Sequence, residues 1–289
     1  MTTEMLRGAP VAEALNAAAC KLVSSLPQKP VLAIVRVGDS QSDAAYERNA
    51  EKRCAGVGID VRRVSLSADV PLLQFEDELR RLTEDADVSG ILLLRPLPAP
   101  LENAGTFSLI PSSKDVDGIT GSSGFAVYSG SGVGFAPCTA RAVIEMLDFY
   151  KIPVSGKKVT VIGRSAVVGR PLSMLLLQRD ATVTVCHSRS GDIREITRAS
   201  DIVISACGQA ERFGAEYFSP GQVVIDVGTN WNEKTQRLCG DVRAAELDGL
   251  VRAVSPVPGG VGAVTTAVLA MHTAEAAVLL RSDGKKQVL

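Results

Sequence analysis

A glycine-containing turn at 163–171, "GRSAVVGRP", separates the apolar run "VTVI" from the apolar run "LSMLLL". A strand followed by such a turn and by a helix that begins near Gly169 and Pro171 points unpaired backbone N–H groups at a phosphate. The spacing is G-x-S-x-x-x-G, which differs from the usual G-x-G-x-x-G fingerprint of dinucleotide-binding proteins. The turn favours nucleotide binding, and a glycine turn that binds no nucleotide is the alternative.

The residues after the next apolar run, "TVTVC", indicate which nucleotide would bind. An NAD enzyme commonly carries an acidic residue here for the ribose 2'-hydroxyl. This chain has His187, Ser188 and Arg189 instead. A 2'-phosphate would be held by Arg164 and Ser188 through charge-assisted and hydroxyl hydrogen bonds. The sequence predicts NADP rather than NAD, and solvated surface arginines are the alternative.

A second candidate site lies on the charged segment 45–54, "AYERNAEKRC". Only 4% of the chain is aromatic, so a tyrosine on this segment stands out. On a helix, the side chain four residues further on, Ala50, shares the face of Tyr46. An alanine can move no proton, so this face offers a binding surface but no base at position 50.

Composition narrows the class of protein. The 289 residues include 31 Lys and Arg against 32 Asp and Glu, so no excess of basic charge favours nucleic acid or a membrane surface. The six cysteines form no C-x-x-C pair and only two histidines could join them, which predicts reduced thiols, a cytoplasmic protein and no metal site. We find no signal-like N-terminus and no apolar run near the roughly 18 residues of a membrane span. A small-molecule ligand fits this composition.

The elements that position these residues follow an alternating pattern. Apolar runs at 30–38, 58–66 and 89–98 alternate with amphipathic stretches, which predicts strands joined by helices and a mostly parallel sheet. The Gly- and Ser-rich stretch 103–136 loses this rhythm and predicts loops and a short hairpin. A helix over 139–150 follows.

The alternation then restarts as a second unit. Strands are expected at 159–163, 182–186, 202–206 and 223–227, with short helices between them. A long helix over 265–282 ends the pattern, and we expect it to cross back to the first domain. The fold class is therefore α/β with two domains.

Seven segments, in this order along nearly the whole chain, resemble the methylenetetrahydrofolate dehydrogenase/cyclohydrolase family. They are "GILLLRPLP" (90–98), "KDVDG" (114–118), "PCTAR" (137–141), "GRSAVVGRP" (163–171), "VIDVGTN" (224–230), "GDV" (240–242) and "PVPGGVG" (256–262). The resemblance implies an N-terminal folate-binding, catalytic domain over 1–140, completed by a C-terminal helix at 265–289. It implies a Rossmann-like NADP-binding domain over 141–264, a tetrahydrofolate cleft between the two domains, and a homodimer.

The resemblance also assigns roles to residues. Tyr46 matches a tyrosine that packs against the folate, and Asp117 matches the carboxylate that binds the pterin ring. A carboxylate suits this ring because a pterin presents an amino group and a ring N–H side by side; a simple Asp-Gly turn is the alternative. The resemblance counts Tyr46 and Asp117 as catalytic residues. The substrate-binding set that it implies is Tyr46, Leu94, Asp117, Pro258, Gly259, Gly260 and Val261. The cofactor-binding set implied is Thr139, with Cys138 beside it, Gly163, Arg164, Ser165, Ser188 and Thr229.

The chain departs from the family pattern at the two groups that serve the cyclohydrolase. Ala50 stands where bifunctional members have a lysine, and Leu94 stands where they have a glutamine. A positioned acid or base typically contributes about 100- to 10,000-fold, whereas hydride transfer depends mainly on alignment of the two rings. Substitution by Lys52, Arg53 or Arg95 is the alternative.

The sequence thus predicts NADP-dependent oxidation of 5,10-methylenetetrahydrofolate with weak or absent cyclohydrolase activity. Two alternatives stay open at this point. One is the full bifunctional enzyme, and the other is a folate- or nucleotide-binding protein that catalyses nothing.

Overall fold

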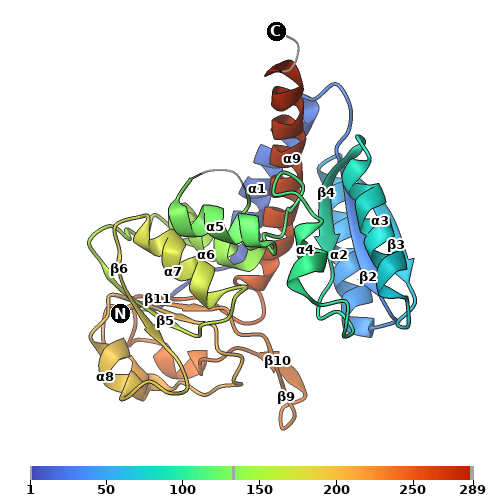
Figure 1. The fold of residues 1–289 in the computed structure, drawn as a ribbon. Coiled ribbons are helices and arrows are strands. Elements are labelled where there is room, and N and C mark those ends of the chain that lie inside the picture. Colours follow the sequence, from blue (N-terminus) through green and yellow to red (C-terminus); the bar gives the residue numbers. More distant parts are fainter. Residues whose placement is uncertain (1, 132–133, 287–289) are drawn as a thin grey trace. The chain divides into compact units, whose positions relative to one another are not determined.

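The computed structural model describes residues 2–131 and 134–286, which form two compact units (Figure 1). Unit 1 contains the chain up to Ala12 and Thr139–Thr265, and unit 2 contains Glu13–Cys138 and the chain from Thr266. The predicted division at 140 and 264 differs from this one mainly in the first 12 residues. These belong to unit 1 because strand β1 (Glu4–Met5) pairs with β11 (Ala253–Val254).

Unit 1 is built on a six-stranded sheet in the order β1-β11-β8-β7-β5-β6, in which every pair is parallel. The four long strands match the predicted runs to within one residue; they are β5 (Lys158–Ile162), β6 (Thr182–Cys186), β7 (Ile202–Ser205) and β8 (Val223–Asp226). The prediction of a mostly parallel α/β sheet is confirmed.

The helices of unit 1 are short, as the sequence predicts. They are α7 (Gly169–Leu177), α8 (Ile193–Arg198) and most of α6 (Cys138–Phe149), with single 3₁₀ turns at Ala215–Tyr217 and Ala244–Leu247. One antiparallel hairpin, β9 (Asn230–Asn232) and β10 (Arg237–Cys239), follows the sheet. Phe213 and Phe218 are fully buried in the apolar core on one side of the sheet.

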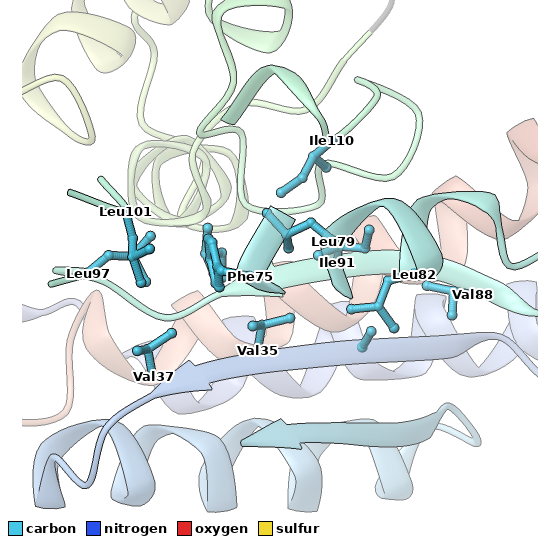
Figure 2. Packing of buried hydrophobic residues seen from close by; sticks show 12 residues of the cluster. Val35, Val37, Phe75, Leu79, Leu82, Val88, Ile91, Leu97, Leu101 and Ile110 are labelled. Atoms are coloured by element: carbon cyan, nitrogen blue, oxygen red, sulfur yellow. The ribbon is translucent and has the colours of Figure 1, made fainter. Parts of the chain in front are cut away.

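Unit 2 contains a parallel three-stranded sheet in the order β3-β2-β4, formed by β3 (Asp60–Leu66), β2 (Val31–Val37) and β4 (Val88–Leu93). Helix α3 (Leu72–Glu84) covers one face, and Figure 2 shows Phe75 and Leu79 packing with Val35 and Ile91 in that layer. Helix α2 (Gln41–Gly56) covers the other face, because Glu47 pairs with Arg36, whose side chain points away from Val35 and Val37.

The prediction of loops and a hairpin over 103–136 is wrong for the residues that the structure describes there. Two helices form instead, α4 (Ala104–Ser108) and α5 (Gly121–Ser129). The side chains of Asn103 and Thr120 accept the backbone N–H groups of Thr106 and Ser123 and so begin the helices. Gly130, at a φ of +69°, ends the second. These capping residues override the low helix propensity of Gly and Ser.

Two longer helices have residues in both units: α1 (Gly8–Ser24) and α9 (Gly262–Lys286). Within α9, the 20 residues 262–281 are long and apolar enough to cross a membrane, a test that core helices of ordinary proteins also pass. Here 61% of the qualifying window is buried inside the protein, which is the pattern of a core helix.

Candidate functional site

Helix α2 of unit 2 carries Tyr46, and one of its faces is buried within that unit. Ser40 begins this helix by accepting the N–H of Asp43 at 3.3 Å. Glu47, Ala50 and Cys54 are its buried residues, and they lie on one face at helical spacing. Glu47 was missed by the sequence interpretation. Its carboxylate is 3.0 Å from Nε of Arg36 on β2, so an ion pair fixes the helix on the sheet.

Within unit 2, the first two residues of the turn "KDVDG" (114–118) fasten it to neighbouring segments. The Lys114 ammonium donates to the carbonyls of Thr83 and Asp85 at 2.6 and 2.7 Å. Asp115 is fully buried and accepts the N–H groups of Ile119 and Thr120 at 3.0 and 2.9 Å. Lys114 and Asp115 therefore position the turn.

Gly118 and Gly90 allow this turn to lie close to neighbouring backbone. Gly118 has a φ of +64°, and a Cβ there would lie 2.4 Å from the carbonyl oxygen of Phe135. A Cβ at Gly90 on β4 would lie 2.6 Å from a methyl group of Val116. Both glycines are required by packing, and together they fix where Asp117 lies.

Asp117 is the carboxylate of the turn that remains for a ligand. Burial raises its pKa to about 6, hydrogen bonds from Cys138 and the charge of Arg95 lower the pKa, and the Asp115 charge raises it. The backbone N–H and the thiol of Cys138, the first residue of α6, both contribute to those hydrogen bonds. A carboxylate has about four lone-pair sites, so acceptor capacity is left for two further donors.

Tyr46 and Cys138 share this environment with Asp117. Burial, followed by the charges of Cys138 and Asp117, raises the pKa of the Tyr46 phenol well above its ordinary value. Burial and the Asp117 charge likewise raise the pKa of the Cys138 thiol. Tyr46, Asp117 and Cys138 thus lie within electrostatic reach of one another, and both neighbours of the carboxylate are neutral at physiological pH.

The two positions that lack the family's lysine and glutamine are filled by apolar side chains. Ala50 is 0% exposed and Leu94 is 7% exposed. The next residue, Arg95, is half-buried; its guanidinium lies 5.7 Å from the centre of the Phe107 ring and 4.0 Å from Glu102. Lys52 is exposed on α2, so among the alternative cations Arg95 is the one whose charge reaches Asp117.

The predicted phosphate turn of unit 1 begins where β5 ends. Gly163 has a φ of +123°, and a Cβ there would lie 2.2 Å from the carbonyl oxygen of Ala206. Gly169 approaches the Gly163 carbonyl just as closely and begins α7 at the predicted residue. The Ser165 hydroxyl accepts the N–H groups of Val168 and Gly169 at 3.1 and 3.4 Å. Ser165 therefore caps the turn, and Arg164 is exposed beside it.

Arg164 and Ser188 lie at the same edge of the sheet. In the β5–β6 pair, Ile162 lies opposite Cys186, and each predicted residue stands two positions beyond one member of that pair. Both Arg164 and Ser188 are exposed. The carboxyl ends of parallel strands are where open α/β sheets bind ligands. Thr229 is also exposed and follows β8 at this edge.

Two buried carboxylates organise the same edge, and the sequence interpretation gave them no role. Asp241 accepts the N–H groups of Cys207 and Gln209, the Ser205 hydroxyl and the Asn230 amide at 2.8–2.9 Å. Asp226 accepts N–H groups from Gly228, Asp241 and Val242. The motifs "VIDVGTN" and "GDV" were the available signal, since the first places Asp226 at the end of an apolar run and the second places Asp241 directly after a glycine.

The loop 256–262 is fastened within unit 1 to the start of α1. The N–H of Gly8 donates to the carbonyl of Gly259 at 2.8 Å, and a Cβ on Gly8 would lie 2.1 Å from the Gly260 carbonyl oxygen. Pro258 and Gly259 are exposed, whereas Gly260 and Val261 are buried. Pro258 and Gly259 are thus the residues of the predicted substrate-binding loop that a ligand could contact. Thr139 is half-buried in the first turn of α6.

Comparisons with known proteins identify the family of the chain. Residues 6–117 match the catalytic domain of tetrahydrofolate dehydrogenase/cyclohydrolase, and residues 137–280 match its NAD(P)-binding domain. The "Bifunctional protein FolD" of Carboxydothermus hydrogenoformans is 42% identical over 281 residues, covering 96% of this chain and 98% of that protein.

Solved structures agree with these matches. The bifunctional FolD of Campylobacter jejuni has a TM-score of 0.92 at 31% identity and covers 96% of this chain and 99% of that one. The Trypanosoma brucei methylenetetrahydrofolate dehydrogenase-cyclohydrolase, solved with NADP cofactor and an inhibitor, has a TM-score of 0.90 at 32% identity, covering 98% and 99%. With both domain models matched across most of its length, the chain belongs to the tetrahydrofolate dehydrogenase/cyclohydrolase family.

Proposed function

We propose that the protein oxidises 5,10-methylenetetrahydrofolate to 5,10-methenyltetrahydrofolate with NADP as the hydride acceptor. The observation that carries the proposal is the grouping of Asp117 and Tyr46 in unit 2, because it pairs a carboxylate that has acceptor capacity left with a neutral aromatic ring. The carboxylate accepts the amino and ring N–H donors of the pterin. The tyrosine ring packs against its flat face.

The residues of unit 1 fit a dinucleotide. A side chain at Gly163 or Gly169 would collide with backbone, so glycine at both positions lets the turn close tightly and sets the start of α7 where a pyrophosphate would lie. NADP, when bound, supplies the carbon that takes the hydride. The chain's own contribution is to bind and orient the two rings, and the folate nitrogens stabilise the cation that forms.

The names of the relatives favour a cyclohydrolase activity in this chain as well, and they do not support the expectation that it is weak or absent. One specific observation favours a dehydrogenase with little cyclohydrolase activity as a second candidate. The side chains at positions 50 and 94 are apolar and buried, so neither can activate water or protonate a ring nitrogen.

One product assay tests the proposal and separates these candidates. The protein is incubated with methylenetetrahydrofolate and NADP, and the methenyl and formyl products are quantified over time. Formation of NADPH supports the proposed oxidation, and the product ratio reports the cyclohydrolase. A protein that binds folate but neither NADP nor NAD would be a binding protein without turnover, and the proposed oxidation would be wrong.

The resemblance to the family also supports a cytoplasmic homodimer. Sedimentation at two protein concentrations tests the dimer. A monomer at all concentrations would contradict this part of the proposal.

We predict that folate affinity depends on the ionisation of Asp117. Because its pKa is about 6, the carboxylate is ionised above that pH and protonated below it. A protonated acid loses acceptor capacity for the pterin donors. The dissociation constant for tetrahydrofolate should therefore rise about tenfold per pH unit below the midpoint, while that for NADP follows a different profile.

Titration calorimetry from pH 5 to pH 8 measures this dependence. Arg95→Met provides the matched test, because removing a cation that lowers the Asp117 pKa should move the midpoint to higher pH. A tetrahydrofolate affinity that stays flat over this range contradicts the prediction.

We predict that Arg164→Ala lowers the preference for NADP over NAD by at least about tenfold, because one charge-assisted hydrogen bond to the 2'-phosphate is lost. The measurement is kcat/KM with each cofactor at saturating folate. Arg170→Ala is the control, since Arg170 is an exposed arginine on α7 in the same segment. Equal use of both cofactors by the unmodified protein, or an Arg164→Ala variant that keeps its preference, counts against this assignment.

A further inference from the structure

Helix α9 places a buried imidazole directly behind the carboxylate turn of unit 2. His272 is 3% exposed, and its Nδ1 atom is 2.9 Å from the carbonyl oxygen of Val116, 156 residues away in the chain. Val116 immediately precedes Asp117. The same Nδ1 atom is 3.8 Å from the Cys138 sulfur.

The chemistry of these groups assigns their hydrogens. A carbonyl oxygen can only accept, so the imidazole must carry a hydrogen on Nδ1 and donate it to Val116. The Cys138 thiol lies 3.3 Å from the same carbonyl oxygen and also bonds to the Asp117 carboxylate. A thiol has one hydrogen, so it can serve only one of these acceptors at a time.

The hydrogen bond from His272 determines which of the two acceptors, the Val116 carbonyl or the Asp117 carboxylate, the thiol serves. A ring N–H at 2.9 Å is a stronger donor than a thiol, so it satisfies the Val116 carbonyl. With that donor in place the carbonyl no longer depends on the Cys138 hydrogen, which can go to the charged and therefore stronger acceptor, the Asp117 carboxylate. The imidazole thus fixes the peptide before Asp117 and also directs a donor to its side chain.

The ring itself is held in place from the other side. The Phe135 ring lies 4.8 Å from the imidazole, centre to centre, at a tilt of 38°. Phe135 is buried, and its carbonyl oxygen lies against Gly118, the residue after Asp117. The imidazole and the Phe135 segment therefore contact the turn on both sides of Asp117.

We propose that His272 is a positioning residue for the folate-binding carboxylate, acting through Val116 and Cys138. This inference rests on the proposed function. It assigns to His272 an effect on folate affinity without an effect on NADP affinity, because the contacts through which it acts lie at Val116 and Cys138, beside Asp117.

Three variants test this role. His272→Phe keeps the ring against Phe135 and removes the donor, so it should raise KM for methylenetetrahydrofolate about tenfold, with KM for NADP within about twofold of wild type. His272→Asn places an amide donor near the position of Nδ1 and should restore most of the folate KM. Thr273→Val is the control, because it removes a different buried hydrogen bond of α9, from Thr273 to the Leu269 carbonyl at 2.8 Å.

The thermal midpoint is measured beside the kinetics. A His272→Phe variant with wild-type folate KM, an equal rise with Thr273→Val, or equal rises in KM for both substrates would each overturn the proposal. Should His272→Phe fail to fold, His272→Gln carries the same expectation, because its amide reaches the position of Nε2 and misses Val116. A wild-type protein that neither oxidises nor binds folate would refute the proposed function itself, which is a different result.

Discussion

Replacing Asp117 by Asn should lower kcat/KM for methylenetetrahydrofolate by at least about 100-fold, because two hydrogen bonds to a charged acceptor are lost or inverted. The amide has the shape of the carboxylate but presents donors of its own toward the pterin amino group. The effect should appear largely in KM, since the role proposed for the carboxylate is to bind the pterin and not to take part in hydride transfer. Steady-state kinetics with folate varied at saturating NADP measure it.

The control for Asp117→Asn is Asp87→Asn, which neutralises an exposed carboxylate of the same unit and should leave both KM values unchanged. The thermal midpoint of Asp117→Asn should stay at or above that of wild type. Burial raises the pKa of Asp117, so the ionised side chain costs stability above pH 6 and the neutral amide removes that cost. Full activity in Asp117→Asn would show that another group binds the pterin.

The sheets could be predicted from the sequence because their strands are continuous apolar runs. In a parallel sheet covered on both faces, strands such as β5, β7 and β8 are mostly apolar, and runs of this kind are visible without knowledge of the fold. β1 and β11 could not be found in this way, because each has two residues and no period. Their pairing, which carries the start of the chain into unit 1, depends on contacts between distant segments.

Much of the candidate site could be predicted from motifs, but its supports could not. Asp117 and Gly118 stand in a motif whose pattern is local. The ion pair between Glu47 and Arg36, and the contact of His272 with Val116, join residues that only the folded chain brings together. From the sequence alone, charged and imidazole side chains at helical spacing are interpreted as solvated faces, because the segments that cover them are not yet known.

At the positions of the missing lysine and glutamine, the sequence and the names of the relatives disagree about cyclohydrolase activity. The sequence identifies Ala50 and Leu94 as departures, and the structure shows that both side chains are buried in unit 2. Relatives named bifunctional cover almost the whole chain. The disagreement therefore concerns two side chains and can be tested directly on them.

Introducing Lys at 50 together with Gln at 94 should raise hydrolysis of methenyltetrahydrofolate by about 100-fold or more, because a positioned acid or base contributes about 100- to 10,000-fold. Hydride transfer should change by less than about threefold, since it depends on ring alignment. Hydrolysis is followed by the loss of methenyl absorbance, and oxidation by NADPH formation in the same preparation. Ala55→Lys, at an exposed position of α2, controls for added positive charge.

The wild-type rate of hydrolysis decides what the Ala50 and Leu94 substitutions mean. A rate close to that of the uncatalysed reaction, raised by Ala50→Lys with Leu94→Gln, would show that the lost pair limits this chain. Substantial hydrolysis in the wild type would show that another cation replaces the lysine, and Lys52→Ala and Arg95→Met identify which one. Lys52 is exposed, whereas Arg95 is half-buried and its charge reaches Asp117, so loss of hydrolysis in Arg95→Met alone is the outcome that the geometry favours for a bifunctional enzyme. Loss in Lys52→Ala would instead require α2 to present a different face from the one it buries here.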